Sequence, residues 1–161
     1  MRLFSLVTLI SLCAGGVSAQ EGWRWWQSTD GGYRVEFMGP PEIENFDTEA
    51  DGSPIRSELA SYANCQSGFT RLKSFDGDKQ HYLTLIMDRD MSNYLGALRQ
   101  DDASEADGVA SRRYMFDVKD GVGIARMVMR GTTVYQLQCV VAPGHENDPD
   151  VARFHKSLEL P

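Results

Sequence analysis

The sequence predicts an α+β domain in which helices cover a largely antiparallel β-sheet. Three observations predict this class. Most segments after residue 20 alternate apolar and polar residues with a period of two, which is typical of half-buried strands. Short turn sequences connect consecutive strand segments. The chain ends in an amphipathic segment that favours a closing helix, so strands and helices are expected to form separate layers.

The first strands form a predicted hairpin. Tyr33 to Phe37 alternates apolar and charged residues, and Asp30-Gly31-Gly32 supplies turn residues before it. Trp23 to Gln27 is expected to pair with this strand. Gly39 to Pro54 is rich in Pro, Glu, Asp and Asn, which predicts a loop.

Period-two patterns predict six further strands, the last three forming an antiparallel meander. Asp120-Gly121-Val122-Gly123 and Gly131-Thr132 provide the turns of that meander. The predicted strands are Ile55 to Ala63, Phe69 to Phe75, His81 to Asp88, Ser111 to Val118, Ile124 to Arg130 and Thr133 to Val141.

Two segments have the helical period instead. Met91, Tyr94, Leu95 and Leu98 fall at i, i+3, i+4 and i+7, which predicts a helix over Ser92 to Ala103. At the C-terminus, Asp148 is a suitable N-cap and Pro149 suits the first helical position. An apolar stripe follows in that segment at Val151, Phe154 and Leu158.

The N-terminus has the pattern of a cleavable signal peptide over residues 1–19. Arg2 provides the positive charge, Leu3 to Ala14 the apolar run, and Val17-Ser18-Ala19 the small residues before the cleavage site. Cys13 leaves a lipoprotein alternative open, although Leu12 before it is larger than a lipid-attachment site favours. We therefore expect one α+β domain over residues 20–161, located in the periplasm or secreted.

Net charge limits the partners of this domain. The chain has 16 basic and 23 acidic residues, and removal of residues 1–19 takes away only Arg2, so 15 minus 23 leaves a net charge of -8. Such a surface repels nucleic acid and anionic lipid. The apolar run at the N-terminus is shorter than the roughly 20 residues of a membrane span. Charge and length therefore argue against nucleic acid and a membrane span as partners, and the partner that we expect is a protein of the cell envelope.

Two cysteines remain after cleavage. Cys65 and Cys139 form an even pair in an oxidising compartment, which favours a disulfide bond. The alternative is that Cys139 is a small buried residue, because it alternates inward with Tyr135 and Leu137.

Four segments together resemble a group of small exported bacterial proteins of unassigned function that have a PsbP-like α/β/α sandwich. The segments are Gly32 to Pro41, Tyr82 to Asp88, Thr133 to Leu137 and Arg153 to Leu158. The usual Phe-Pro-Gly of that group is Phe37-Met38-Gly39 here. The resemblance implies the fold, and it implies no catalytic residue.

Arginines and tryptophans are the candidate binding residues. Arg112, Arg126 and Arg130 occupy even-numbered positions of the meander, so we expect them on one sheet face. Their partner is either an anionic ligand or the protein's own carboxylates. Trp23, Trp25 and Trp26 either form an exposed platform for a partner, or Trp23 and Trp25 close one end of the core.

No catalytic, cofactor or metal motif is present. Asp47 to Glu58 has the ligand spacing of a calcium loop, but Pro54 and the absence of flanking helices argue against it. His81, His145 and His155 are dispersed. The leading hypothesis is a non-catalytic interaction module that docks an envelope protein. The alternatives are a small anionic-ligand-binding protein that uses the arginine face, and a hydrolase with a dispersed active site.

Overall fold

The computed structural model describes residues 22–50 and 53–161. The predicted signal peptide, residues 1–19, lies outside the described residues. Nine strands and two helices follow one another in the described part. They are β1 (Arg24–Gln27), β2 (Arg34–Phe37), β3 (Glu42–Ala50), β4 (Ser53–Tyr62), β5 (Cys65–Arg71), α1 (Lys79–Tyr94), β6 (Leu98–Ala106), β7 (Val109–Val118), β8 (Gly121–Arg130), β9 (Thr133–Val141) and α2 (Pro149–Lys156).

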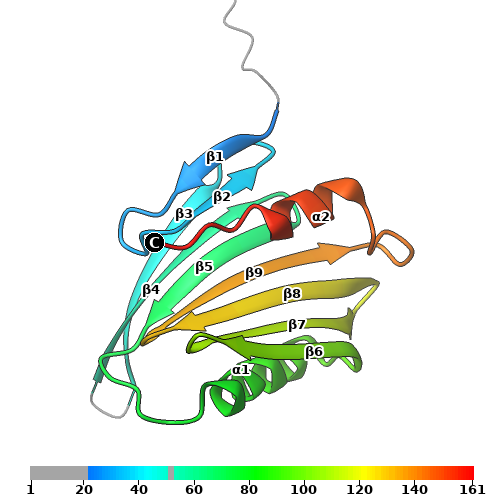
Figure 1. Ribbon diagram of the computed structural model, residues 1–161. Coiled ribbons are helices and arrows are strands. Elements are labelled where there is room, and N and C mark those ends of the chain that lie inside the picture. Colours follow the sequence, from blue (N-terminus) through cyan, green and yellow to red (C-terminus); the bar gives the residue numbers. More distant parts are fainter. Residues whose placement is uncertain (1–21, 51–52) are drawn as a thin grey trace, which may run out of the picture.

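Seven strands form one antiparallel sheet in the order β3-β4-β5-β9-β8-β7-β6 (Figure 1). Strand β9 lies at the centre because it pairs with β5 on one side and with β8 on the other. Helix α1 carries the chain from β5 to the far edge at β6. The predicted hairpin is confirmed as the separate two-stranded sheet β1-β2.

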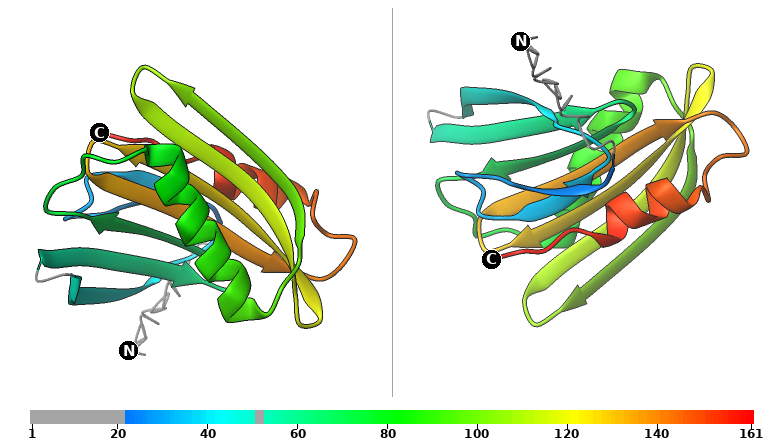
Figure 2. Two further views of the ribbon diagram at one scale, coloured as in Figure 1. Left: turned by 90° about the horizontal axis from the view of Figure 1, so that it is seen from below. Right: turned by 90° about the horizontal axis from the view of Figure 1, so that it is seen from above.

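The molecule has three layers, as the two views of Figure 2 show. Helix α1 crosses one face of the sheet, packing mainly on β7. Helix α2 and the β1-β2 hairpin cover the other face. The predicted α+β class and the closing C-terminal helix are therefore confirmed. Neither described helix is long and apolar enough to cross a membrane.

Each face of the sheet has its own core. Aromatic side chains dominate the face under α2, where Tyr33, Phe37 and Phe154 are almost completely buried. Under α1, Leu83 and Phe116 are fully buried. Strands β8 and β9 contribute side chains to both cores, so they are buried on both faces. Their positions are fixed by packing from two sides.

The prediction of a strand at His81 to Asp88 and a helix at Ser92 to Ala103 is wrong. Helix α1 begins at Lys79, where the side chain of Asp78 caps the backbone N–H of His81. The helix ends at Tyr94, and its C-cap residue Leu95 has a left-handed φ of 52°. A Cβ atom at position 96 would lie 1.9 Å from the backbone carbonyl oxygen of Asp117, so the chain needs glycine where it turns into β6.

Two strand boundaries also differ from the prediction. Most of the expected loop at 39–54 is strand β3, which pairs along its whole length with β4. The expected strand at 69–75 is displaced toward the N-terminus, since β5 spans Cys65–Arg71. Strand β3 is the edge of the sheet, and its residues 42–47 are all exposed, which explains why a mostly polar segment can form a strand here.

The predicted disulfide is present. Cys65 in β5 and Cys139 in β9 are register partners, and their Cα atoms are 4.1 Å apart. Cys139 is also fully buried, in the same core as Leu137 and Val141. The inward orientation expected from its alternation with Leu137 is therefore confirmed, although its thiol is not free. The bond closes a separation of 74 residues and links the two strands at the centre of the sheet.

Candidate functional site

The three candidate arginines do not share one face, because the turn after β7 is shorter than the prediction assumed. Val118 pairs with Gly121, which leaves a two-residue turn between the strands. Each even-numbered position of β8 therefore faces an odd-numbered position of β7. Arg126 is opposite Arg113 rather than Arg112, and Arg112 lies on the α1 face opposite Met127.

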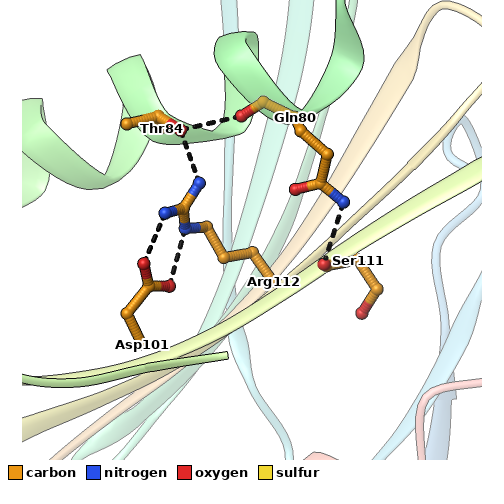
Figure 3. A network of polar contacts seen from close by, with 5 residues as sticks. All are labelled: Gln80, Thr84, Asp101, Ser111 and Arg112. Atoms are coloured by element: carbon orange, nitrogen blue, oxygen red, sulfur yellow. Dashed lines mark hydrogen bonds and ion pairs between the residues drawn. The ribbon is translucent and has the colours of Figure 1, made fainter. Parts of the chain in front are cut away.

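Arg112 is part of a structural network between α1 and β6 (Figure 3). Its guanidinium makes a two-pronged contact with the Asp101 carboxylate, with 2.8 Å from Nε to Oδ1, and it also donates to the Thr84 hydroxyl. Thr84 in turn donates to the carbonyl of Gln80 at 2.8 Å. Only 11% of the Arg112 side chain is exposed. Arg112 thus connects α1 to the edge strand β6. Of the two partners expected for it, the structure shows the protein's own carboxylate, that of Asp101.

Arg126 and Arg130 occupy the α2 face of β8, and they have different environments. Arg130 is exposed and donates to the carbonyl of Pro161. Arg126 is half-buried beneath α2 and donates from Nη1 to the carbonyl of His155 at 2.8 Å. Its Nε is buried without a hydrogen-bond partner in the described structure.

A pocket of about 270 Å³ lies beside Arg126, between β7, β8 and α2. Arg113 and His155 line it together with Arg126. We call these three residues the Arg126 cluster. The Nε2 atom of His155 is also buried and unpartnered in the described structure. Two buried polar atoms without a partner in one pocket are costly unless a ligand or solvent satisfies them.

Electrostatics in the Arg126 cluster favour an anion. Burial and the neighbouring Arg113 lower the pKa of the Arg126 guanidinium. Burial and, to a smaller extent, the positive charges of Arg126 and Arg113 together lower the pKa of His155 to about 4. His155 is therefore neutral at neutral pH, when its ring nitrogens provide one donor and one acceptor. The cluster then has two positive charges on opposed positions of neighbouring strands, an unfavourable arrangement when no anion is near.

Carboxylates neutralise other arginines of the fold. Arg34 contacts Glu159, and Arg153 binds both oxygens of Glu36 at 2.9 and 2.7 Å. Glu146, which also lines the pocket, is held by Arg99 at 3.2 Å. Among the described residues, no salt bridge joins a carboxylate to Arg126 or Arg113.

The tryptophans are divided between two environments. Trp26 packs edge-on against Tyr33 and Phe37, with ring centroids 5.7 and 6.1 Å apart. Trp23 packs partly against the same core and lies under the guanidinium of Arg153. Trp25 is 47% exposed, so the prediction that it closes the core is wrong.

The outer face of the hairpin is consequently a charged aromatic surface. The Cζ atom of Arg34 lies 4.6 Å from the centroid of the Trp25 ring. The Cζ atom of Arg153 lies 4.7 Å from the centroid of the Trp23 ring. Cation–π contacts of this kind stabilise exposed aromatic rings without a binding partner. A partner-binding role of these tryptophans stays a prediction.

Other candidate chemistry has less support. Asp47 is a register partner of Arg56 in β3 and β4, so the described residues of the calcium-like segment lie on paired strands. Asp51 and Gly52 of that segment lie outside the described residues. Within residues 22–50 and 53–161, no group of three or more His, Cys, Asp or Glu side chains is arranged to hold a metal ion.

Sequence reasoning missed two residues of the pocket, Arg113 and His155. A two-residue turn at Lys119-Asp120 would have paired Arg113 with Arg126. His155 is four residues after Val151, which places both on one helix face toward the sheet. Both signals are local, but each needs the correct turn length or helix orientation to be used.

Comparisons with known proteins show the fold. No protein-family model matches this chain, and no curated protein matches its sequence. The chain is similar to the solution structure of cyanobacterial PsbP from Synechocystis sp. PCC 6803, with a TM-score of 0.59 and 9% sequence identity over 93% of this chain and 99% of that one. A crystal structure of a protein of unknown function from Pseudomonas aeruginosa aligns with a TM-score of 0.38 and 13% identity, over 84% of this chain and 90% of that one.

The class of protein defined by these findings is an α+β domain with a PsbP-like fold. At 9% identity the likeness to PsbP concerns the fold alone. Membership in the group of small exported bacterial proteins stays a prediction.

Proposed function

We propose that this protein is an exported, non-catalytic binding protein that holds a small anionic ligand at the Arg126 cluster. The observation that carries the proposal is the absence of a carboxylate salt bridge to Arg126 or Arg113 within the described residues, in a domain whose net charge is strongly negative. Because acidic residues outnumber basic ones, two neighbouring arginines without such a partner indicate a place kept for another anion.

Size and chemistry limit the ligand. A pocket of about 270 Å³ is slightly smaller than typical drug-sized ligand sites, so it suits a small carboxylate or phosphate compound. The planar guanidinium of Arg126 has a free Nε–H that matches one oxygen of such an anion. The neutral His155 ring contributes a further hydrogen bond without adding charge.

Anion-dependent thermal stabilisation tests this proposal. Phosphate, citrate and acetate are added separately to the protein at low ionic strength, and the unfolding midpoint is followed by tryptophan fluorescence. Ligand at ten times its dissociation constant should stabilise the fold by about 1.4 kcal/mol. The variant Arg126→Met should lose this effect, whereas Arg130→Met, an exposed arginine on the same strand face, should keep it.

Two results would overturn the proposal. One is the absence of stabilisation by all three anions. The other is equal stabilisation of the Arg126→Met variant and the wild type, because general screening of surface charge produces that pattern.

Docking of an envelope protein is a second candidate function. Leu95 at the end of α1 is 95% exposed, and Tyr94 and Leu98 beside it are also exposed. Exposed apolar side chains that lie next to one another on a protein surface are typical of interaction sites. Crosslinking in intact cells should capture a partner with the wild type and lose it with Leu95→Asp. Recovery of the protein alone would count against this function.

A further inference from the structure

A second cavity, separate from the Arg126 cluster, lies on the opposite face of the sheet. It has a volume of about 360 Å³ and runs between α1 and strands β3, β4, β5 and β9. Helix α1 packs mainly over β7, with fewer contacts to β6 and β8. The cavity lies on the side of α1 that faces β3, β4 and β5. We call this cavity the α1 groove.

The floor of the α1 groove is polar. Gln66 and Gln138 are register partners on β5 and β9, and Gln136 lies two residues before Gln138 on the same face. Gly68, opposite Gln136, adds no side chain, so the floor is recessed there. A Cβ at position 68 would approach the Glu58 carbonyl oxygen to 2.7 Å, so this recess requires glycine.

One floor side chain is buried with an unused donor. Gln138 is only 3% exposed, and its Oε1 accepts from Gln66 at 3.4 Å. Its Nε2 has no hydrogen-bond partner in the described structure. A buried amide donor costs free energy when it is unpaired, so a side chain kept in this state indicates a ligand atom that accepts from it.

Hydrogen bonds to Asp90 hold the helix wall of the groove in place. The Oδ2 atom of Asp90 accepts from the hydroxyl of Tyr114 at 2.7 Å and from Nε2 of Gln136 at 2.6 Å. The Nη2 atom of Arg89 lies 3.9 Å from the other carboxylate oxygen of Asp90. The Asp90 carboxylate is therefore already satisfied and does not need a cationic ligand. Its negative charge also disfavours an anion.

Aromatic rings stand at the two sides of the groove. Phe46 on β3 and Tyr94 at the end of α1 line it, and they are 42% and 40% exposed. Amides that both donate and accept suit ligand hydroxyl groups, and exposed aromatic faces suit the apolar faces of a ring. We propose that the α1 groove binds a neutral saccharide of about two sugar units.

Titration of isotope-labelled protein with maltose, cellobiose and N,N′-diacetylchitobiose tests this proposal by NMR. At millimolar concentrations, at least one disaccharide should shift the side-chain amide signals of Gln66, Gln136 and Gln138. The variant Gln138→Met should weaken that binding about tenfold, the effect of losing one hydrogen bond. Gln27→Met, which alters a glutamine on the hairpin outside the groove, is the matched control and should bind like the wild type.

Thermal unfolding of the same variant separates a ligand-binding donor from a structural one. Because its Nε2 is unpaired, replacing Gln138 with Met should raise the unfolding midpoint while disaccharide binding is weakened. The proposal is overturned if no disaccharide shifts the groove amides, or if Gln138→Met binds as tightly as the wild type. It is also overturned if trialanine shifts these amides and the disaccharides do not, since the groove would then be a peptide site.

Discussion

Acidification should destabilise this fold through His155. The ordinary pKa of histidine is 6.5, and in the folded protein that of His155 is lowered to about 4. The unfolded chain therefore takes up a proton near pH 6.5, whereas the folded chain takes it up only near pH 4. Stability that is fully present above pH 6.5 is lost progressively as the pH falls to about 4.

The two pKa values give the size of this loss. A difference of about 2.5 between them corresponds to about 3 kcal/mol in the free energy of unfolding. The physical causes are the burial of the ring, which removes water from the charged form, and the repulsion by Arg126 and Arg113. This loss is a large part of the stability of an ordinary small domain.

Urea unfolding between about pH 7 and pH 4 measures the effect, with tryptophan fluorescence as the signal. The variant His155→Gln should lose about 3 kcal/mol less than the wild type over this interval. Glu36 and Glu146, whose pKa values are lowered, also lose stabilising interactions in acid. Their contribution is common to both proteins and cancels in the difference.

His81→Gln is the matched control, because His81 is exposed on α1 and should leave the pH dependence unchanged. Equal losses in the wild type and His155→Gln would refute the reasoning. A bound anion should favour protonated His155, so phosphate at saturation is expected to reduce the acid loss of the wild type.

Three further predictions concern stability and processing. Replacing Cys65 and Cys139 together by Ser should lower the free energy of unfolding by about 4 kcal/mol in urea titrations, because the unfolded chain loses a crosslink between residues 74 apart in sequence. Arg112→Met should cost about 2 kcal/mol in the same assay, since it leaves the partly buried Asp101 carboxylate without its partner. Intact-mass measurement of the exported protein should give a chain that begins at Gln20.

Each of these three predictions has a control variant or an outcome that would contradict it. Arg99→Met, which breaks a more exposed pair with Asp117, should cost less than about 1 kcal/mol and is the control for Arg112→Met. Equal costs for the two variants would contradict the role of Arg112 in joining α1 to β6. Unchanged stability on removal of both cysteines would contradict the disulfide prediction, and a mass that includes residues 1–19 would contradict cleavage.

Local patterns determined several elements correctly. The hairpin of β1 and β2, the meander of β7, β8 and β9 and the helix α2 were all predicted from alternation, turn residues and a Pro after a capping residue. The pairing of Cys65 with Cys139 followed from the count of cysteines. These features depend on residues that are close in sequence, so hydrophobic periodicity and turn residues are enough to predict them.

Helix α1 shows where such patterns fail. Leu83, Ile86, Met87 and Asp90 are buried at i, i+3, i+4 and i+7. Leu83, Leu85 and Met87 in the same segment also fit the period of a strand, so the pattern by itself does not distinguish the two structures. Contact with the β7 face selects the helix, and this contact joins residues far apart in sequence.

The sequence by itself determined the α+β class, the hairpin, the meander and the closing helix. It favoured a disulfide between Cys65 and Cys139 and left a free, buried Cys139 as the alternative, and the structure decided for the disulfide. Only the tertiary structure decided which side chains meet in a site. The short turn after β7 placed Arg113 rather than Arg112 on the face of Arg126, because a change of register by an odd number of residues exchanges the two faces of a strand. The α1 groove likewise combines side chains from α1, β5 and β9, whose proximity comes from sheet order and helix packing rather than from any local pattern.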